Sequence, residues 1–198
     1  KMGRTIVEAL SAESEIEVAG VVDKLAHGST LERAAGGPLP LFDNADKAFD
    51  ATKPDVVVDF TNAAWTPVLT KAALPRGVRP VIGTTGLSQD YINALAHDCR
   101  ERKIGGVVAA NFALGAVLMM HMARIAANYF DSAEIIELHH DQKVDAQSAT
   151  SIATARGMIE ARGGKPFKRN EPDATPVEGT RAGAVDGVTI HSVRLPGF

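Results

Sequence analysis

The sequence contains one cysteine among 198 residues, and its charges nearly balance, with 21 lysines and arginines against 24 aspartates and glutamates. The single thiol, Cys99, excludes an internal disulfide framework and a zinc site built from several cysteines. Without a basic excess or a basic stripe interleaved with aromatic residues, the sequence does not predict nucleic-acid binding. No apolar run approaches the roughly 20 residues that a membrane span needs. These features predict a cytoplasmic globular protein that binds neither nucleic acid nor membrane.

Short valine-rich runs alternate with helical patterns through the first half of the chain, an order typical of a parallel sheet with crossover helices. The near-continuous apolar strands fit burial on both faces. We therefore predict a Rossmann-like, doubly wound parallel α/β sheet. Strands are expected at residues 17–22, 55–60, 79–83 and 105–110, and helices at residues 3–12, 63–75 and 88–103.

The sequence opens on a helical pattern, KMGRTIVEAL, with no strand before it. In a dinucleotide-binding fold the first strand leads through a glycine-rich turn into the first helix. We therefore expect that this strand is missing and that KMG is the tail of the turn, with an ordinary helix N-terminus as the alternative. Asp23 follows the next apolar run at about the 20-residue distance at which a carboxylate meets an adenosine ribose. Lys24 offers a cation to a ribose 2′-phosphate.

Two further loops follow predicted strands at the edge where open α/β sheets bind ligands. VIGTTG contains Gly83, Thr84 and Thr85, and AANF spans residues 109–112. Glycine lets a backbone approach a flat ring closely, and threonine hydroxyls add hydrogen bonds. An ordinary tight turn is the alternative for each loop.

From residue 112 the pattern changes, and a second region begins. FALGAVLMMHMARIAANYF predicts a long apolar helix, whose methionines favour core or interface packing over a cofactor site. SAEIIELHH and GVTIHSVRL predict strands, and residues 163–186, rich in glycine, proline and charge, predict a long loop.

The second region contains IELHHDQKVDAQSATSIATA, residues 136–155. Adjacent strand residues point to opposite faces, so His139 and His140 are not expected to chelate one metal, and we predict no metal site. An imidazole can donate a proton, Lys143 can do so or bind an anion, and the N–H groups that open the next helix, near Ser148 and Thr150, can hold a carboxylate. This set suits an anionic substrate that accepts a hydride and a proton; a solvated histidine pair is the alternative.

The motifs KMG, VVDFT, VIGTTG, AANFALGAV, IELHH, the run at residues 143–150 and HSVRLPG occur in this order over essentially the whole chain. Together they resemble the 4-hydroxy-tetrahydrodipicolinate reductase (dihydrodipicolinate reductase) family of lysine biosynthesis by the diaminopimelate route. The resemblance implies a dinucleotide-binding domain at residues 1–111 and an α+β domain for substrate binding and oligomerisation at residues 112–198. NADH or NADPH would reduce a cyclic imine dicarboxylate. A homotetramer is also implied, as is a further C-terminal segment that returns to the cofactor domain.

The resemblance also implies roles for individual residues. His139 matches the catalytic proton donor and acceptor, and Lys143 matches the catalytic proton donor. Substrate contacts are implied for His140, Ser148, Ala149 and Thr150. Cofactor contacts are implied for Lys1, Met2, Asp23, Lys24, Gly83, Thr84, Thr85, Ala109, Ala110, Asn111 and Phe112.

Three residues depart from the family's DAPSGTA motif: Gln147 replaces proline, Ala149 replaces glycine and Ser151 replaces alanine. The N–H of Ala149 can hold a carboxylate only if its backbone angles suit a residue with a Cβ. Two alternatives stay open: a related NAD(P)-dependent reductase of a different substrate, and a non-catalytic module that senses a dinucleotide or dicarboxylate. Retention of His139 and Lys143 favours catalysis, since a sensor needs no proton donor.

Overall fold

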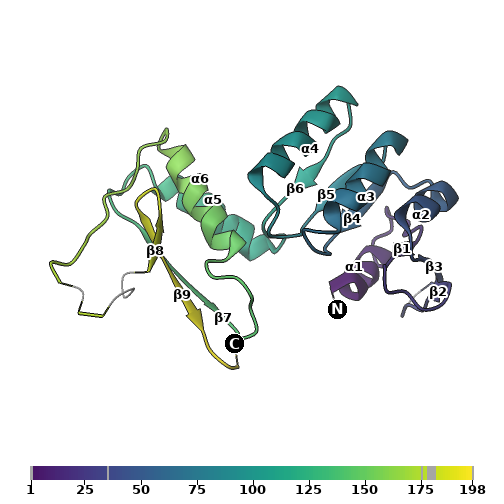
Figure 1. Ribbon diagram of the computed structural model, residues 1–198, viewed down its shortest axis with the longest axis horizontal. Coiled ribbons are helices and arrows are strands. Elements are labelled where there is room, and N and C mark those ends of the chain that lie inside the picture. Colours follow the sequence, from purple (N-terminus) through teal and green to yellow (C-terminus); the bar gives the residue numbers. More distant parts are fainter. Residues whose placement is uncertain (1, 35, 175, 178–181, 198) are drawn as a thin grey trace. The chain divides into compact units, whose positions relative to one another are not determined.

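The structure is a computed structural model, and it describes residues 2–34, 36–174, 176–177 and 182–197. The chain divides into two compact units, Lys1–Ala109 and Ala110–Phe198. Figure 1 shows the helices and strands of each unit.

The first unit alternates strands and helices. Local sequence sets several helix boundaries. At the start of the helix Ala45–Thr52, the Asn44 side chain accepts a hydrogen bond from the Lys47 N–H. Ser88 is the N-cap of the helix Gln89–Glu101, as its place in the sequence predicts. Gly77, with φ 76°, ends the short 3-10 turn. The elements are α1 (Met2–Ser11), β1 (Val21–Val22), β2 (Thr30–Leu31), β3 (Leu39–Phe42), α2 (Ala45–Thr52), β4 (Val56–Asp59), α3 (Thr66–Ala73), η1 (Leu74–Arg76), β5 (Arg79–Ile82), α4 (Gln89–Glu101) and β6 (Val107–Val108).

These strands form two sheets, in the orders β1-β3-β2 and β4-β5-β6. All neighbours are parallel except β2, which runs antiparallel to β3. Helix α3 with η1 connects β4 to β5, and α4 connects β5 to β6, which is the crossover arrangement of parallel strands. The predicted Rossmann-like α/β class is therefore confirmed.

Apolar clusters hold the helices on the strands. Phe49 of α2 and Leu69 of α3 pack with neighbours that include Val22 and Val57, and Ile82 of β5 packs with Leu95 of α4. Cys99 belongs to the second cluster, where it is buried and free of any disulfide. Burial raises the pKa of its thiol, so Cys99 serves packing, as its place in a helical run suggests.

Several short elements differ from the sequence prediction. The strand expected at residues 17–22 is limited to Val21–Val22, because β1 pairs with β3 only there. Elements β2, β3 and α2 were not predicted. The loop expected at residues 163–186 contains strand β8 (Gly183–Val185), which forms a hairpin with β9 (Val188–Arg194) through Asp186 and Gly187, both at positive φ. Asp-Gly between two strands is a hairpin signal, and this one was overlooked.

The second unit places two helices on a three-stranded sheet. Its remaining elements are α5 (Leu114–Ala126), β7 (Glu134–His139) and α6 (Ala149–Ala161), and the sheet order is β7-β9-β8. Strands β7 and β9 are parallel, with Ile135 opposite Ile190 and His139 opposite Arg194. The core contains Ala127, Ala155, Met158, Ile159, Phe167, Val188 and Ile190.

The two faces of β7 differ, as strand alternation requires. Ile135 packs on the core and Glu137 is buried, whereas Ile136 and Leu138 are 69% and 49% exposed. Among the described residues, no helix is both long enough and apolar enough to span a bilayer.

Candidate active site

His139 and His140 stand at the carboxyl end of β7 and have different surroundings. His139 is the last residue of the strand, and its side chain is 34% exposed. Its Nδ1 is buried and lies 3.4 Å from Oε2 of Glu137. His140 is exposed, and its carbonyl accepts a hydrogen bond from the Lys143 N–H, which begins the turn after the strand. The two histidines therefore differ in exposure, and the different roles implied for them stay predictions.

The turn after β7 carries Lys143, whose ammonium is bound to Oδ1 of Asp145. This contact holds the pKa of the Asp145 carboxyl below its usual value. The Lys143 side chain is 22% exposed. The cation is therefore held near the surface by a local carboxylate.

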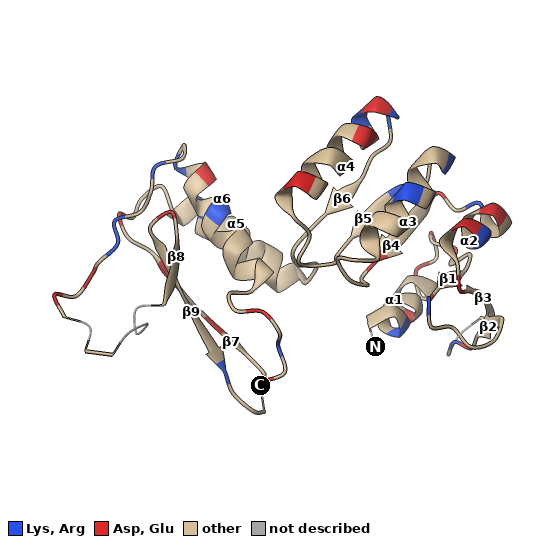
Figure 2. Cartoon of the chain, viewed as in Figure 1, with Lys and Arg blue, Asp and Glu red and all other residues tan. Residues whose placement is uncertain are grey.

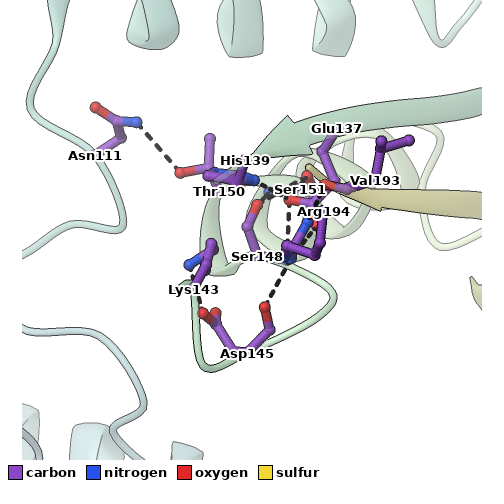
Figure 3. Close-up of polar contacts among 10 residues, drawn as sticks. All are labelled: Asn111, Glu137, His139, Lys143, Asp145, Ser148, Thr150, Ser151, Val193 and Arg194. Carbon is purple, nitrogen blue, oxygen red and sulfur yellow. Dashed lines mark hydrogen bonds and ion pairs between the residues drawn. The ribbon is translucent and has the colours of Figure 1, made fainter. Parts of the chain in front are cut away.

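The start of α6 lies directly after this turn. Ser148 is the N-cap, with Oγ accepting from the Ser151 N–H at 3.2 Å. Ala149 and Thr150 are the first two residues of the helix, and N–H groups at these positions have no partner within a helix. Helix N-termini of this kind attract carboxylates. Figure 3 shows His139, Lys143, Ser148 and Thr150 around this helix start.

A buried carboxylate, Glu137, joins these parts. Its Oε1 accepts from Nη2 of Arg194 at 2.8 Å, and its Oε2 accepts from the Ser148 N–H at 3.1 Å. Burial raises the pKa of Glu137, but the hydrogen bonds, led by those from Ser148 and Arg194, outweigh burial and hold the pKa at about 2. Glu137 is therefore ionised at neutral pH.

Asn111 connects the start of the second unit to α6. Its Nδ2 donates to Oγ1 of Thr150 at 3.2 Å, and its Oδ1 accepts from the Ala113 N–H at 2.9 Å. A residue predicted to contact the cofactor thus contacts one predicted to bind substrate. Its neighbours Ala110 and Phe112 lie in the same connecting segment, where Phe112 is 44% exposed.

The three departures from the family motif fit the local structure. The side chain of Gln147 lies against β8, where a Cβ added at Gly183 would be 2.3 Å from Nε2 of Gln147. Ala149 is helical and is not among the non-glycine residues with positive φ, so its Cβ causes no backbone strain. Ser151 supplies an Oγ 3.3 Å from Oε2 of Glu137.

The candidate cofactor residues of the first unit lie at the carboxyl ends of strands. Gly83 follows β5, and a Cβ there would lie 2.3 Å from Cε1 of Phe60, so the glycine leaves room for the Phe60 ring. Thr84 is buried, and its Oγ1 has no hydrogen-bond partner among the described residues. Thr85 is exposed, and the Ala109 N–H continues the β5–β6 ladder by donating to Ile82. The unsatisfied hydroxyl of Thr84, in a loop at the carboxyl end of β5, fits a hydrogen-bonding ligand such as a nicotinamide dinucleotide.

Asp23 and Lys24 are exposed directly after β1. Oδ1 of Asp23 accepts from the Leu25 N–H at 2.9 Å, which fixes the turn. Met2 opens α1 and is 50% exposed, and Lys1 lies outside the described residues. The roles implied for these residues stay predictions.

Glu137, Arg194 and Asp145 also belong to this candidate site, and none of them is predicted from the sequence. One signal was available: Glu137 is a charged residue two positions before His139, inside an apolar strand, and therefore on the same face as His139. No comparable signal marks Arg194, whose contact depends on strand register.

Two family models together match nearly the whole chain: "Dihydrodipicolinate reductase, N-terminus" matches residues 1–112, and "Dihydrodipicolinate reductase, C-terminus" matches residues 115–198. The 4-hydroxy-tetrahydrodipicolinate reductases of Geobacillus thermodenitrificans and Enterococcus faecalis are 44% and 42% identical to it, and each alignment covers 100% of this chain and 76% of the relative.

A solved structure is also similar, the dipicolinate-bound dihydrodipicolinate reductase from Paenisporosarcina sp. TG-14. Its TM-score is 0.77 at 39% sequence identity, with 100% of this chain and 76% of that chain covered. Sequence and fold therefore agree along the full chain. The chain belongs to the dihydrodipicolinate reductase family, the NAD(P)H-dependent oxidoreductases of lysine biosynthesis.

Proposed function

We propose that this protein reduces 4-hydroxy-tetrahydrodipicolinate to tetrahydrodipicolinate with NADH or NADPH. The reaction consumes one hydride and one proton, and the 4-hydroxyl group leaves as water. One observation carries the proposal. This chain is 44% identical to a 4-hydroxy-tetrahydrodipicolinate reductase, and it contains both proton-donor candidates, His139 and Lys143. Such a reductase works where the nicotinamide pool is available, in the cytoplasm.

In this proposal, His139 donates and accepts a proton, and Lys143 donates one. The bound nicotinamide supplies the hydride. Because Nδ1 of His139 is buried, Nε2 is the ring nitrogen that a substrate can reach. The ammonium of Lys143, held by Asp145, is a second proton source and a positive charge for an anionic substrate.

The substrate's carboxylates are bound by His140 and the start of α6. The N–H groups of Ala149 and Thr150 and the helix dipole favour an anion there, and Ser148 caps the same turn. The ordinary helical backbone of Ala149 supports this role despite the loss of the family's glycine.

The first unit holds the cofactor in this proposal, and the second holds the substrate. Asp23 and Lys24 contact the adenosine ribose and its 2′ substituent, and Met2 lies at the pyrophosphate. Residues 83–85 and 109–112 contact the nicotinamide side, supported by the unsatisfied hydroxyl of Thr84.

We further propose a homotetramer assembled through the second unit. Helix α5 has no buried residue, and Figure 2 shows little charge along it. Met119 and Met122 are 48% and 61% exposed, and Ile136 and Leu138 are exposed on β7. Exposed apolar surface of this extent is typical of an interface.

Steady-state oxidation of NADH at 340 nm with freshly generated 4-hydroxy-tetrahydrodipicolinate tests the function. Turnover that requires this substrate is expected. Turnover only with another cyclic imine would identify a related reductase. Tight binding of NADH and dipicolinate without any turnover would identify a sensing module and contradict the proposal.

A further inference from the structure

Glu137 and Arg194 form a buried ion pair beside His139 that the proposed chemistry leaves without a role. Glu137 precedes His139 by two residues on β7, and Arg194 lies opposite His139 on β9. Their side chains are 6% and 18% exposed, so both charges are largely withdrawn from water. Buried charges of this kind call for a reason, because removing them from water is costly.

The pair holds both ends of the segment that separates Lys143 from the start of α6. Nη2 of Arg194 donates to the Asp145 carbonyl at 2.7 Å as well as to Glu137. Oε2 of Glu137 accepts from the Ser148 N–H at 3.1 Å (Figure 3). Residues 145–148 are therefore fixed to the sheet at each end, and the carboxylate of Asp145 in turn holds Lys143.

The same carboxylate lies beside the candidate proton donor. Oε2 of Glu137 is 3.4 Å from the buried Nδ1 of His139. Nδ1 has no hydrogen-bond partner among the described residues, so the negative charge of Glu137, rather than a hydrogen bond, favours a proton on this nitrogen. Nε2 is then left to exchange a proton with substrate.

We propose that Glu137 and Arg194 are positioning residues that set the geometry of His139, Lys143 and the carboxylate-binding start of α6. The inference rests on the proposed function of this site. Stability alone is a weak reason for the pair, since buried ion pairs are often replaceable by neutral side chains without loss of stability. Glu137 also keeps its charge at neutral pH, because hydrogen bonds hold its pKa at about 2.

Glu137→Gln in the intact protein tests the proposal, with Glu160→Gln as the matched control. Glu160 lies on α6 and forms an exposed ion pair with Arg124 at 2.8 Å, in the same unit but away from the helix start. We expect Glu137→Gln to lower kcat about 10²-fold, as a misplacement of about 1 Å does, and to leave the Kd for NADH unchanged. The control should keep wild-type kcat.

The double variant Glu137→Gln/Arg194→Met separates positioning from folding. Removing both charges leaves no unpaired buried ion, so its melting temperature should not fall below that of Glu137→Gln. Its kcat should remain low. A folded double variant with wild-type kcat would overturn the proposal, as would a folded Glu137→Gln with wild-type kcat.

Dipicolinate binding, measured by calorimetry, gives a readout that does not need turnover. We expect about tenfold weaker binding in Glu137→Gln, the effect of losing one hydrogen bond to a charged group, and no change in Glu160→Gln. If the wild type failed to turn over, the proposed function would fall while this comparison still decided the positioning role. Equal dipicolinate affinity in all the proteins would refute that role.

Discussion

The side chain of Asn111 donates a hydrogen bond to Oγ1 of Thr150, 39 residues further along the chain. Asn111 lies in the segment predicted to contact the nicotinamide, and Thr150 is the second residue of the helix predicted to bind a substrate carboxylate. One side-chain contact within the second unit therefore joins two segments with different predicted ligands. Its energy can be isolated, because Thr150→Val removes the hydroxyl with little change of shape.

A double-mutant cycle of Asn111→Ala and Thr150→Val should show a coupling of about 1 kcal/mol in kcat/KM, the usual size for a neutral hydrogen bond. Each single variant should raise the KM for substrate by about fivefold. The double variant should be no worse than Asn111→Ala alone. Strictly additive effects in the steady-state assay would mean that the contact contributes nothing to binding.

Variants of the two histidines and the lysine should fail in different ways. His139→Ala and Lys143→Ala should lower kcat by about 10² to 10⁴-fold, the usual contribution of a positioned general acid. His140→Ala should mainly raise KM, because it removes binding shared by the ground and transition states. Fluorescence titration should show unchanged NADH affinity in all three.

An exposed histidine outside the site, His97 on α4, is the control for these variants. His97→Ala should match the wild type in kcat and KM. If His139→Ala kept wild-type kcat and lost NADH affinity instead, His139 would be a nucleotide contact and the assignment as proton donor would be wrong.

Much of the framework could be predicted from local sequence signals. Ser88 identified the start of α4, and the apolar run before His139 identified β7. The two-residue strands β1 and β2 carry too few residues for a periodic pattern, so their extent depends on pairing with β3. The length of these strands therefore depends on tertiary pairing and not on local sequence propensity.

The candidate site also combines residues that the sequence predicts with residues that it does not. His139, Lys143 and Ser148 could be selected from residue type and spacing, because one strand end, one turn and one helix cap carry them. The partner of Glu137 could not be selected, since Arg194 lies 57 residues away and meets it only through the register of β7 and β9. Long-range register is not encoded in a local pattern.

Cofactor preference should respond to Asp23. A carboxylate accepts hydrogen bonds from the ribose hydroxyls of NADH, while Lys24 can pair with the 2′-phosphate of NADPH. Asp23→Ala should weaken NADH binding by roughly 10-fold or more, with a smaller effect on NADPH. Asp43→Ala, at an exposed carboxylate after β3, is the control and should change neither Kd. Equal losses for both cofactors would contradict the assignment of Asp23.

Assembly should depend on the exposed face of β7. The intact protein should sediment as a tetramer in analytical ultracentrifugation, because Ile136 and α5 expose apolar surface that an interface would cover. Ile136→Asp should shift the protein toward smaller species, since it would bury a charge. Leu25→Asp, at a 79% exposed position of the first unit, should leave the tetramer intact. A monomer at every wild-type concentration would refute this assembly.

Acid should weaken the fold through Glu137. Its pKa is held at about 2 in the folded protein, below the ordinary value of 4.5, by hydrogen bonds that include those from Ser148 and Arg194. A depressed folded pKa gives stability that is fully present above about pH 4.5 and is lost as the pH falls toward 2. The loss is on the order of 3 kcal/mol for this group. Glutamine does not titrate, so Glu137→Gln lacks this pH-dependent contribution to stability.

Urea unfolding from neutral pH down to about pH 2.5 should therefore show a shrinking difference between the wild type and Glu137→Gln. Other carboxylates, including Asp145, titrate in both proteins and cancel in this difference. Glu160→Gln should instead stay parallel to the wild type, because its exposed ion pair contributes little. If the difference in unfolding free energy between the wild type and Glu137→Gln stayed constant over this range, the ionised form of Glu137 would not stabilise the fold.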